Sequence, residues 1–315
     1  MTTTLRIEAR TASSPLGQLI DDYLDSCRAR GLSRRTIDQA YGYSLHDVFL
    51  PWCADQGITD VSQLSQRVLD RFTAALLDRP TRKGTLSPAT VHSYVRPVRQ
   101  VVLWAKRSGE ETTGALPQLP RVPRKVRDVL TRAEIDRLEE AADVERDRLI
   151  VRVLADTGIR ATELCQLMVG DIARHQGGSL LKIRGKGGKE RLVPLRPTVA
   201  RRLERFVRSR REATESDFIF VSRRRGRLSQ DYEPLTRNGI LQLLYDLADR
   251  ARLTKHVYTH LLRHSFATEA LRRGMSPVQL ANVLGHSGLR MIERTYAHLN
   301  VNDAYDAVLR ALGGD

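Results

Sequence analysis

A proline-rich stretch near the middle of the chain, GALPQLPRVPRKVRD at residues 114–128, most constrains what this sequence can fold into. Its prolines, Pro117, Pro120 and Pro123, recur every three residues, which favours an extended polyproline-like path. About ten such residues reach on the order of 30 Å. The stretch therefore predicts a stiff linker, and a chain of 315 residues is long enough for a folded domain on each side of it.

This linker is also basic, because it contains four basic residues and a single acidic one: Arg121, Arg124, Lys125 and Arg127 against Asp128. The whole chain has 52 lysines and arginines against 37 acidic residues, a net charge of +15. Such an excess favours a polyanionic partner, and the planar fork of arginine suits bidentate phosphate contacts. We expect the linker to cross a groove of double-stranded DNA. An inert spacer, and an arginine content that reflects genome composition, are the alternatives.

The cysteines and the apolar runs exclude several other classes of protein. Cys27, Cys53 and Cys165 are scattered and odd in number, which suits a reducing cytosol and argues against a disulfide framework or a zinc cluster. No run of 18 apolar residues predicts a transmembrane helix, and the first residues lack the apolar stretch of a signal peptide. We expect a cytoplasmic protein with no membrane partner.

Residues 14–113 are expected to form a compact helical bundle, preceded by a flexible segment at 1–13. No strand signal precedes residue 110. Helical spacing of apolar residues predicts helices over 15–30, 33–56 and 61–77, the second of them bent or broken at Pro51.

A fourth helix of this bundle begins at Ser87 and Pro88, a good N-cap and first-turn pair, and runs to about residue 106. Its polar face carries several basic side chains. The candidates for DNA contact on this helix and on the linker are Arg96, Arg99, Arg121, Arg124 and Lys125.

Residues 129–299 are expected to form a second, mostly α domain with a small sheet. Thr131 and Glu134 have the spacing of a capping box at the start of its first helix. Two strands, 179–184 and 190–195, are joined at GKGGK, which predicts a hairpin. A third strand is predicted at 218–221. Further helices are predicted at 145–156, 161–168, from Pro197, and at 236–251, 260–273, 276–284, 289–297 and 302–312.

Two cationic residues stand at turns of this second domain. Arg160 follows Thr157-Gly158, where one helix ends and another begins, and a surface arginine is the ordinary interpretation. Lys186 lies in the glycine-rich hairpin, where a solvated turn lysine is the usual explanation. A P-loop is not supported, because both the spacing and the Ser/Thr after the lysine are absent.

The segment THLLRHSFAT places His260 and Arg263 three residues apart, hence on one face of a helix. His264 is four residues from His260, the spacing of a zinc pair. The glutamate of an HExxH motif is missing, with Leu261 in its place, and no third ligand is evident, so the sequence predicts no metal site.

The order and contexts of six residues carry a family resemblance: Arg160, Lys186, His260, Arg263, His286 and Tyr296. Their motifs, TG-R-x-x-E-L, GKG-x-KER-LVPL, H-x-L-R-H-FAT, LGH and Tyr-x-His, closely resemble those of the tyrosine recombinase and phage integrase family. The resemblance covers the whole second domain, and the linkage of several motifs makes it specific. SPATVHSYVRPVRQVVLWA, in the first domain, resembles the family's core-binding bundle less distinctively.

This resemblance implies a mainly α fold, with a helical, SAM-like core-binding domain and a mixed α/β catalytic domain that holds a small antiparallel sheet. It assigns Arg160 and Arg263 to the non-bridging oxygens of a DNA phosphate, with His286 adding a hydrogen bond. Glu163, three residues past Arg160, would orient the site.

The resemblance also implies a covalent mechanism. Tyr296 would attack the phosphorus, His260 would accept its proton, and Lys186 would protonate the departing 5′ oxygen. The product is a 3′-phosphotyrosine with a free 5′-hydroxyl. Its bond energy is retained, so the reaction needs neither ATP nor another cofactor, and the two guanidiniums do the work of a metal pair.

Recombination further implies four active sites, hence a homotetramer on two DNA sites. About a dozen residues precede the first bundle, so we expect a simple recombinase without an arm-binding domain that recognises a core site with inverted repeats. The apolar face of residues 300–315 predicts a C-terminal helix. The resemblance implies that this helix docks on a neighbouring protomer, with packing on its own domain as the alternative. An accessory directionality factor is a further expected partner.

The biological setting and the rival functions stay open at this point. His286 and Tyr296 are ten residues apart, where many Xer-like members have nine, which favours a mobile-element integrase. The chain would then act on the bacterial nucleoid or be encoded by a phage or mobile element. A type IB topoisomerase uses a similar residue set, and a DNA-binding protein that has lost catalysis is the alternative from another class.

Overall fold

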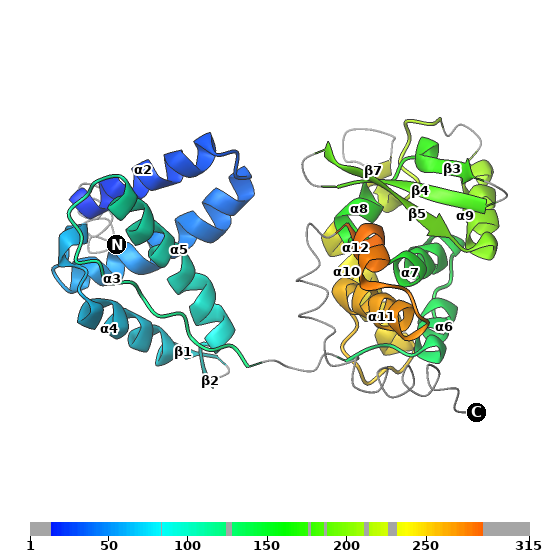
Figure 1. Ribbon diagram of the computed structural model, residues 1–315. Coiled ribbons are helices and arrows are strands. Elements are labelled where there is room, and N and C mark those ends of the chain that lie inside the picture. The colour runs from blue at the N-terminus through cyan, green and yellow to red at the C-terminus, as the bar shows by residue number, and fades with distance from the viewer. Residues whose placement is uncertain are drawn as a thin grey trace, which may run out of the picture. The chain divides into compact units, whose positions relative to one another are not determined.

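The computed structural model describes residues 14–82, 84–123, 128–175, 178–185, 188–210, 214–225 and 232–285. The chain divides into two compact units, Met1–Lys125 and Val126–Asp315 (Figure 1). Each unit has a hydrophobic core of its own. The prediction for residues 1–13 lies outside the described residues. Among those that are described, no helix combines the length and the hydrophobicity needed to span a membrane.

The first unit is a helical bundle, as predicted. Its helical elements are α2 (Pro15–Ala29), the π-helix η1 (Thr36–Phe49), α3 (Leu50–Asp55), the 3-10 turn η2 (Val61–Gln63), α4 (Gln66–Leu77) and α5 (Pro88–Arg107). Pro51 lies in the first turn of α3, which explains the predicted break, because proline needs no amide partner there. Ser87 caps α5 by accepting a hydrogen bond of 3.2 Å from the Thr90 amide, which confirms that helix start.

A short hairpin in this unit was not predicted. Strands β1 (Pro80–Thr81) and β2 (Gly84–Thr85) pair antiparallel, with Pro80 opposite Thr85. Each strand has only two residues, and all four are exposed, so no alternation of apolar and polar residues could reveal them.

The first residues of the proline-rich segment are attached to the bundle. The Thr113 hydroxyl donates to the carbonyl oxygen of Leu64 at 2.7 Å, and Nη1 of Arg99 donates to the carbonyl oxygen of Pro117 at 3.1 Å. Ala115, Leu116 and Leu119 pack against the bundle core. The segment therefore leaves the surface of this unit only after about residue 120.

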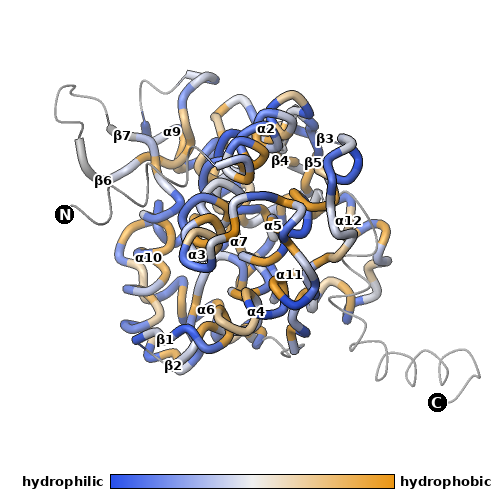
Figure 2. Tube along the Cα trace, turned by 90° about the vertical axis from the view of Figure 1, so that its left-hand side faces the viewer, coloured by the Kyte–Doolittle hydropathy of each residue, from blue (hydrophilic) through white to orange (hydrophobic). Residues whose placement is uncertain are grey.

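The second unit is built around α7 (Glu145–Thr157), whose residues Leu149–Leu154 are almost all fully buried. Helices α6 (Arg132–Glu140), α9 (Pro197–Ser209) and α11 (Thr259–Arg272) pack against it. The other helical elements of the part of this unit that the structure describes are α8 (Ala161–Cys165), the 3-10 turn η3 (Val169–Asp171), α10 (Arg237–Arg250) and α12 (Pro277–Leu284). Along α10, Figure 2 shows hydrophobic residues interspersed with hydrophilic ones, as expected for an amphipathic helix.

The start of this unit confirms the predicted capping box. The Thr131 hydroxyl accepts from the Glu134 amide at 3.2 Å, and the Glu134 carboxylate accepts from the Thr131 amide at 2.7 Å. The neighbouring Leu130 is buried, and its amide donates to the hydroxyl of Ser265 in α11 at 2.7 Å. The chain that leaves the linker is thus fixed directly to α11.

The larger sheet described in the second unit has three antiparallel strands in the order β3 (Ile172–His175), β4 (Gly178–Arg184), β5 (Glu190–Leu195). The predicted pair of strands is confirmed as β4 and β5, with Arg184 opposite Glu190. The sheet, with the helices around it, gives the mainly α fold with small antiparallel sheets that was predicted.

The third predicted strand, 218–221, is wrong. Phe218 makes an isolated bridge to Met168, while Val221 begins β6 (Val221–Arg225), which pairs with β7 (Tyr232–Pro234) in a separate two-stranded sheet. Ile219 and Phe220 are fully buried, because this apolar run fills the core instead of joining the main sheet. The true third strand, β3, is half exposed and carries little strand signal.

Candidate active site

Arg160 stands at the turn between α7 and α8. Helix α7 ends at Gly158, whose φ of +64° is left-handed, and Arg160 is the N-cap residue of α8. A Cβ on Gly158 would come within 2.5 Å of Cδ1 of Phe266, so only glycine fits this turn. The TG-R motif is thus a helix stop followed directly by a helix start, and it leaves the Arg160 side chain 36% exposed.

Glu163 holds Arg160 in place, since its carboxylate accepts from the Arg160 amide and from Nη1 of Arg160, each at 2.8 Å. The Glu163 side chain is only 5% exposed. Burial alone would raise the pKa of this carboxyl, but the hydrogen bonds from Arg191 and Arg160 outweigh burial and hold the pKa below its usual value. Glu163 is therefore an ionised, buried anchor beside Arg160.

The second cation on Glu163 is Arg191 of β5, which was not among the residues predicted from the sequence. Its Nη1 and Nη2 donate to the two carboxylate oxygens at 2.9 and 2.8 Å, and its Nε donates to the carbonyl oxygen of Val283 at 2.7 Å. One signal could have revealed it. Residues two apart on a strand share a face, and Arg191 shares its face with the buried Val193 and Leu195, where a charge requires a partner.

Helix α11 supplies the next two predicted residues. His260 is exposed in its first turn, and Arg263 is buried one turn later, so the predicted i, i+3 pair lies on one helix. Nη1 of Arg263 donates to the carbonyl oxygen of Gly158 at 2.7 Å, and Nη2 donates to that of Leu284 at 2.8 Å. Arg263 thereby reaches the turn that carries Arg160.

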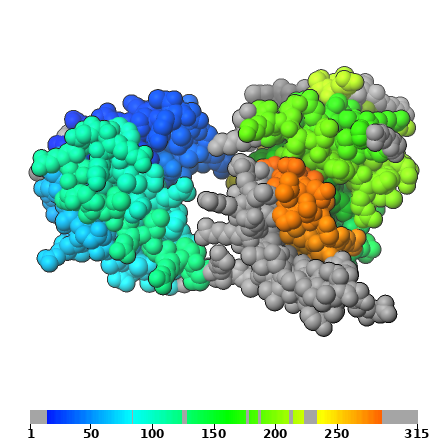
Figure 3. Space-filling model, in the orientation of Figure 1, coloured from blue at the N-terminus to red at the C-terminus, as the bar shows by residue number. Residues whose placement is uncertain are grey.

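Three arginines meet at the carbonyl end of α12. Arg191 donates to Val283, Arg263 to Leu284, and Nη2 of Arg160 to Gly285, the last at 3.3 Å. The last carbonyls of a helix have no partner within it and carry the negative end of its dipole, so cations stabilise them. Figure 3 shows α12, in orange, at the surface of the second unit.

Three of the predicted catalytic residues lie outside the described residues. His286 follows Gly285 directly in the chain, Lys186 belongs to the segment that joins β4 to β5, and Tyr296 comes ten residues after His286. On either side of Lys186, the described residues Gly185 and Lys189 are joined by a hydrogen bond of 2.7 Å from the Gly185 amide to the carbonyl oxygen of Lys189.

The residues predicted to contact DNA differ in their exposure to solvent. Arg96 and Arg121 are exposed, and Arg99 is half-buried because it bonds the carbonyl of Pro117. Arg124 and Lys125 lie outside the described residues.

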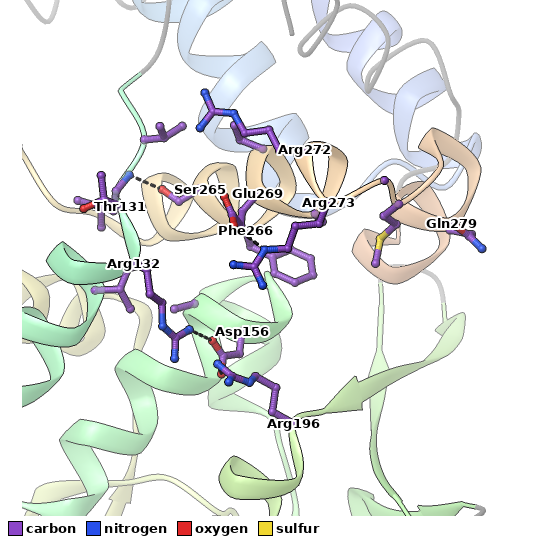
Figure 4. A pocket seen from close by; sticks show the side chains of 18 residues that line it. Thr131, Arg132, Asp156, Arg196, Ser265, Phe266, Glu269, Arg272, Arg273 and Gln279 are labelled. Atoms are coloured by element: carbon purple, nitrogen blue, oxygen red, sulfur yellow. Dashed lines mark hydrogen bonds and ion pairs between the residues drawn. The ribbon is translucent and has the colours of Figure 1, made fainter. Parts of the chain in front are cut away.

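A surface pocket of about 940 Å³ lies elsewhere, between the start of α6, α11 and α12 (Figure 4). Its lining includes Asp156, bonded to Arg132 at 2.9 Å, and Glu269, bonded to Arg273 at 2.6 Å. Neither Arg160 nor Arg263 lines it, so its size does not mark the site of chemistry. In the described ranges, no group of three or more His, Cys, Asp or Glu side chains could hold a metal ion.

Three guanidiniums meet at one helix end, and a single carboxylate, Glu163, lies between two of them. Together they form a net cationic site suited to a phosphate. The comparison with family models agrees, since residues 128–303 match the phage integrase family. The chain belongs to this family of tyrosine recombinases. This recombinase is 31% identical over 292 residues to the tyrosine recombinase XerD of Staphylococcus haemolyticus, a match that spans 90% of this chain and 94% of that relative.

Solved structures share the fold of this recombinase. The XerH site-specific recombinase bound to its difH substrate, in a pre-cleavage complex, is 21% identical with a TM-score of 0.65, over 91% of this chain and 83% of that one. The Tn1549 transposon integrase, in complex with transposon right end DNA, is 18% identical with a TM-score of 0.69, over 94% and 99% of the two chains. The chain is thus a tyrosine site-specific recombinase, an enzyme that breaks and rejoins DNA.

Proposed function

We propose that this recombinase cuts DNA through a covalent bond between Tyr296 and a 3′ phosphate, with Arg160 and Arg263 as the phosphate clamp. The observation that carries the proposal is the meeting of the two arginines on neighbouring carbonyls, Leu284 and Gly285, directly before His286 in the chain. Attack on a phosphodiester increases the charge on its non-bridging oxygens. Guanidiniums that are already fixed in place lower the barrier without reorganising during the reaction.

In the proposed reaction, the hydroxyl oxygen of Tyr296 forms a bond to phosphorus and the bond from phosphorus to the 5′ oxygen breaks. His260 accepts the proton of the tyrosine, and Lys186 gives a proton to the departing 5′ oxygen. His286 donates a hydrogen bond to the phosphate. The exposed place of His260, one turn from Arg263 on α11, is compatible with this role. Rejoining reverses the steps with a 5′-hydroxyl from the other duplex.

The proposed substrate is a short double-stranded core site with inverted repeats, and two protomers bind each site. Two such sites, each with its two protomers, then come together as a homotetramer on DNA. Strand exchange between two duplexes needs four cuts, hence four active sites. That XerH and the Tn1549 integrase are seen on DNA supports DNA as the partner. The exposed Arg96 and Arg121 are proposed to contact the phosphates of the core site.

The test uses a core site selected by repeated binding from a randomised duplex pool, then synthesised with single nicks at successive positions. A nick just beyond the scissile phosphate lets the short 5′-hydroxyl fragment diffuse away and traps the covalent intermediate. We expect a protein–DNA adduct whose peptide map contains Tyr296, and no adduct with Tyr296→Phe at unchanged DNA affinity. An adduct that survives in Tyr296→Phe would show that another residue is the nucleophile. Paired sites then distinguish recombination from mere relaxation by their exchanged products.

A further inference from the structure

We infer that Arg191 is a positioning residue of the cleavage site, which holds Arg160 and the carbonyl end of α12 together. The inference rests on the proposed function, because it assigns Arg191 no contact with DNA and makes it act through Arg160. One guanidinium joins three elements: it extends from β5, binds Glu163 of α8 through both oxygens, and binds Val283 of α12.

Only arginine offers the geometry that this junction needs. Its planar fork presents Nη1 and Nη2 to the two oxygens of Glu163 while Nε points to the carbonyl of Val283. The three donors lie in one rigid plane, so they fix both the distance and the angle between α8 and α12. A lysine carries its three donors on one rotatable nitrogen, so it cannot hold both carboxylate oxygens and the carbonyl of Val283 in one fixed plane.

The position of Glu163 explains why the contact matters for Arg160. Oε1 accepts from Arg191 and from the Arg160 guanidinium, while Oε2 accepts from Arg191 and from the Arg160 amide. The three side chains together carry one net positive charge. Without Arg191 the buried carboxylate would face Arg160 alone, and the pair would be neutral. The positive charge of Arg160, which is proposed to bind a phosphate, would then be cancelled by Glu163, the residue that holds Arg160 in place.

Arg191 also lies against the residue that precedes His286. A Cβ on Gly285 would come within 3.0 Å of Cζ and 2.9 Å of Nη1 of Arg191, and Gly285 has a left-handed φ of +64°. The glycine of the LGH motif therefore makes room for this guanidinium. Gly285 is followed directly in the sequence by His286, the next proposed catalytic residue.

The experiment compares two substrates that differ only at the scissile group: the natural phosphate, and a methylphosphonate in which one charged oxygen is replaced by a methyl group. The neutral group needs less cationic stabilisation in the transition state. Arg191→Met in the full-length chain is expected to slow single-turnover cleavage of the phosphate about a hundredfold, with a smaller loss on the methylphosphonate, at a DNA Kd within about threefold of wild type.

The matched control is Arg202→Met, which breaks another arginine–carboxylate junction in the same unit. Arg202 binds Glu139 at 2.6 Å and Glu145 at 2.8 Å, and among the described residues it makes no hydrogen bond or ion pair with α12. It is expected to leave the ratio of the two cleavage rates at the wild-type value. Arg191→Lys keeps the positive charge, so its ratio of phosphate to methylphosphonate cleavage rates is expected to lie between those of Arg191→Met and wild type. It should still cleave the phosphate about tenfold more slowly than wild type.

The outcomes separate this inference from the proposed function. Suppose that the wild type forms an adduct at Tyr296 but Arg191→Met has the same ratio of cleavage rates as Arg202→Met. This result overturns the inference about Arg191 and leaves the proposed function standing. No wild-type adduct overturns both. If thermal melting shows that Arg191→Met does not fold, Arg191→Lys decides: a slowed cleavage at unchanged Kd supports the inference, and wild-type cleavage overturns it.

Discussion

Nη1 of Arg263 donates a hydrogen bond of 2.7 Å to the carbonyl oxygen of Gly158, the residue that ends α7 two positions before Arg160. Nη2 of the same side chain donates to Leu284 at the end of α12. A single buried guanidinium of α11 therefore closes two helix ends whose carbonyls would otherwise lack a partner. Arg263, one of the two arginines proposed to bind the phosphate, therefore also stabilises the fold.

Arg263→Ala and Arg160→Ala are accordingly expected to differ in stability but not in their effect on cleavage. Loss of Arg263 leaves two buried carbonyls unpaired and should lower the free energy of unfolding by about 2–4 kcal/mol. Arg160, which is 36% exposed, should cost about 1 kcal/mol or less. Both variants should lose cleavage of the nicked substrate by far more than DNA binding. Urea unfolding and single-turnover cleavage measure the two effects, and near-normal cleavage in either variant would remove its proposed role.

Gly158→Ala should damage this junction from the other side. The new methyl group would overlap Phe266 of α11, and the left-handed φ adds backbone strain, so we expect a loss of about 3 kcal/mol. Gly274→Ala is the matched control, because Gly274 also has a positive φ, +89°, but open space around it, and should lose only about 1–2 kcal/mol. Equal losses in urea unfolding would mean that the clash with Phe266 relaxes freely.

The helices of this recombinase could be predicted because their signals are local. Ser87 and Thr131 each cap a helix through an amide three residues away, and the apolar faces repeat within one element. Strand β3 was missed because its four residues have no alternation, and 218–221 was misassigned because a buried apolar run is compatible with both a strand and a core segment.

The same distinction between local and long-range contacts applies to the residues of the site. Arg160 and Glu163 are three residues apart, so their pairing follows from helix geometry. Arg191 lies 28 residues from Glu163 and 92 from Val283, and contacts at those separations are set by how β5 packs against α8 and α12. Spacing within the sequence carries no information on such a contact. Only the charge on the inward side of a strand indicates that some partner exists.

The acid sensitivity of the fold should depend on Glu163. Because its pKa is lower in the folded chain than the ordinary value of 4.5, the ionised form favours folding. This contribution is complete above about pH 4.5 and is lost as the pH falls through the lowered folded pKa. We expect the free energy of unfolding of Glu163→Gln to be smaller than that of wild type at pH 7, with a gap that narrows below pH 4.5. A gap that stays constant down to pH 3 would contradict the assignment; urea unfolding across this range measures it.

Arg96 and Arg99 should respond differently to substitution, although both were predicted to contact DNA. Arg96 is exposed, so Arg96→Ala should weaken binding to all sequences alike and reduce the slope of log K against log salt by about 1. Arg99 bonds the linker at Pro117, so Arg99→Ala should in addition speed tryptic cleavage after the exposed Arg121. Binding titrations at several salt concentrations and timed proteolysis separate the two, and equal proteolysis in both variants would count against the linker contact.

Deletion of residues 300–315 should separate binding from assembly. In the sequence, Val301, Tyr305, Leu309 and Leu312 fall on one apolar helical face, which we propose docks on a neighbouring protomer. The truncated chain should bind a single core site with wild-type affinity but fail to bring two sites together, because the protomers lose the contact that links them. Gel shifts with one and with paired sites measure both steps. Asp303→Asn with Asp306→Asn, which keeps the apolar face, is the control and should assemble normally. Unchanged assembly after the deletion would instead assign this segment to its own domain.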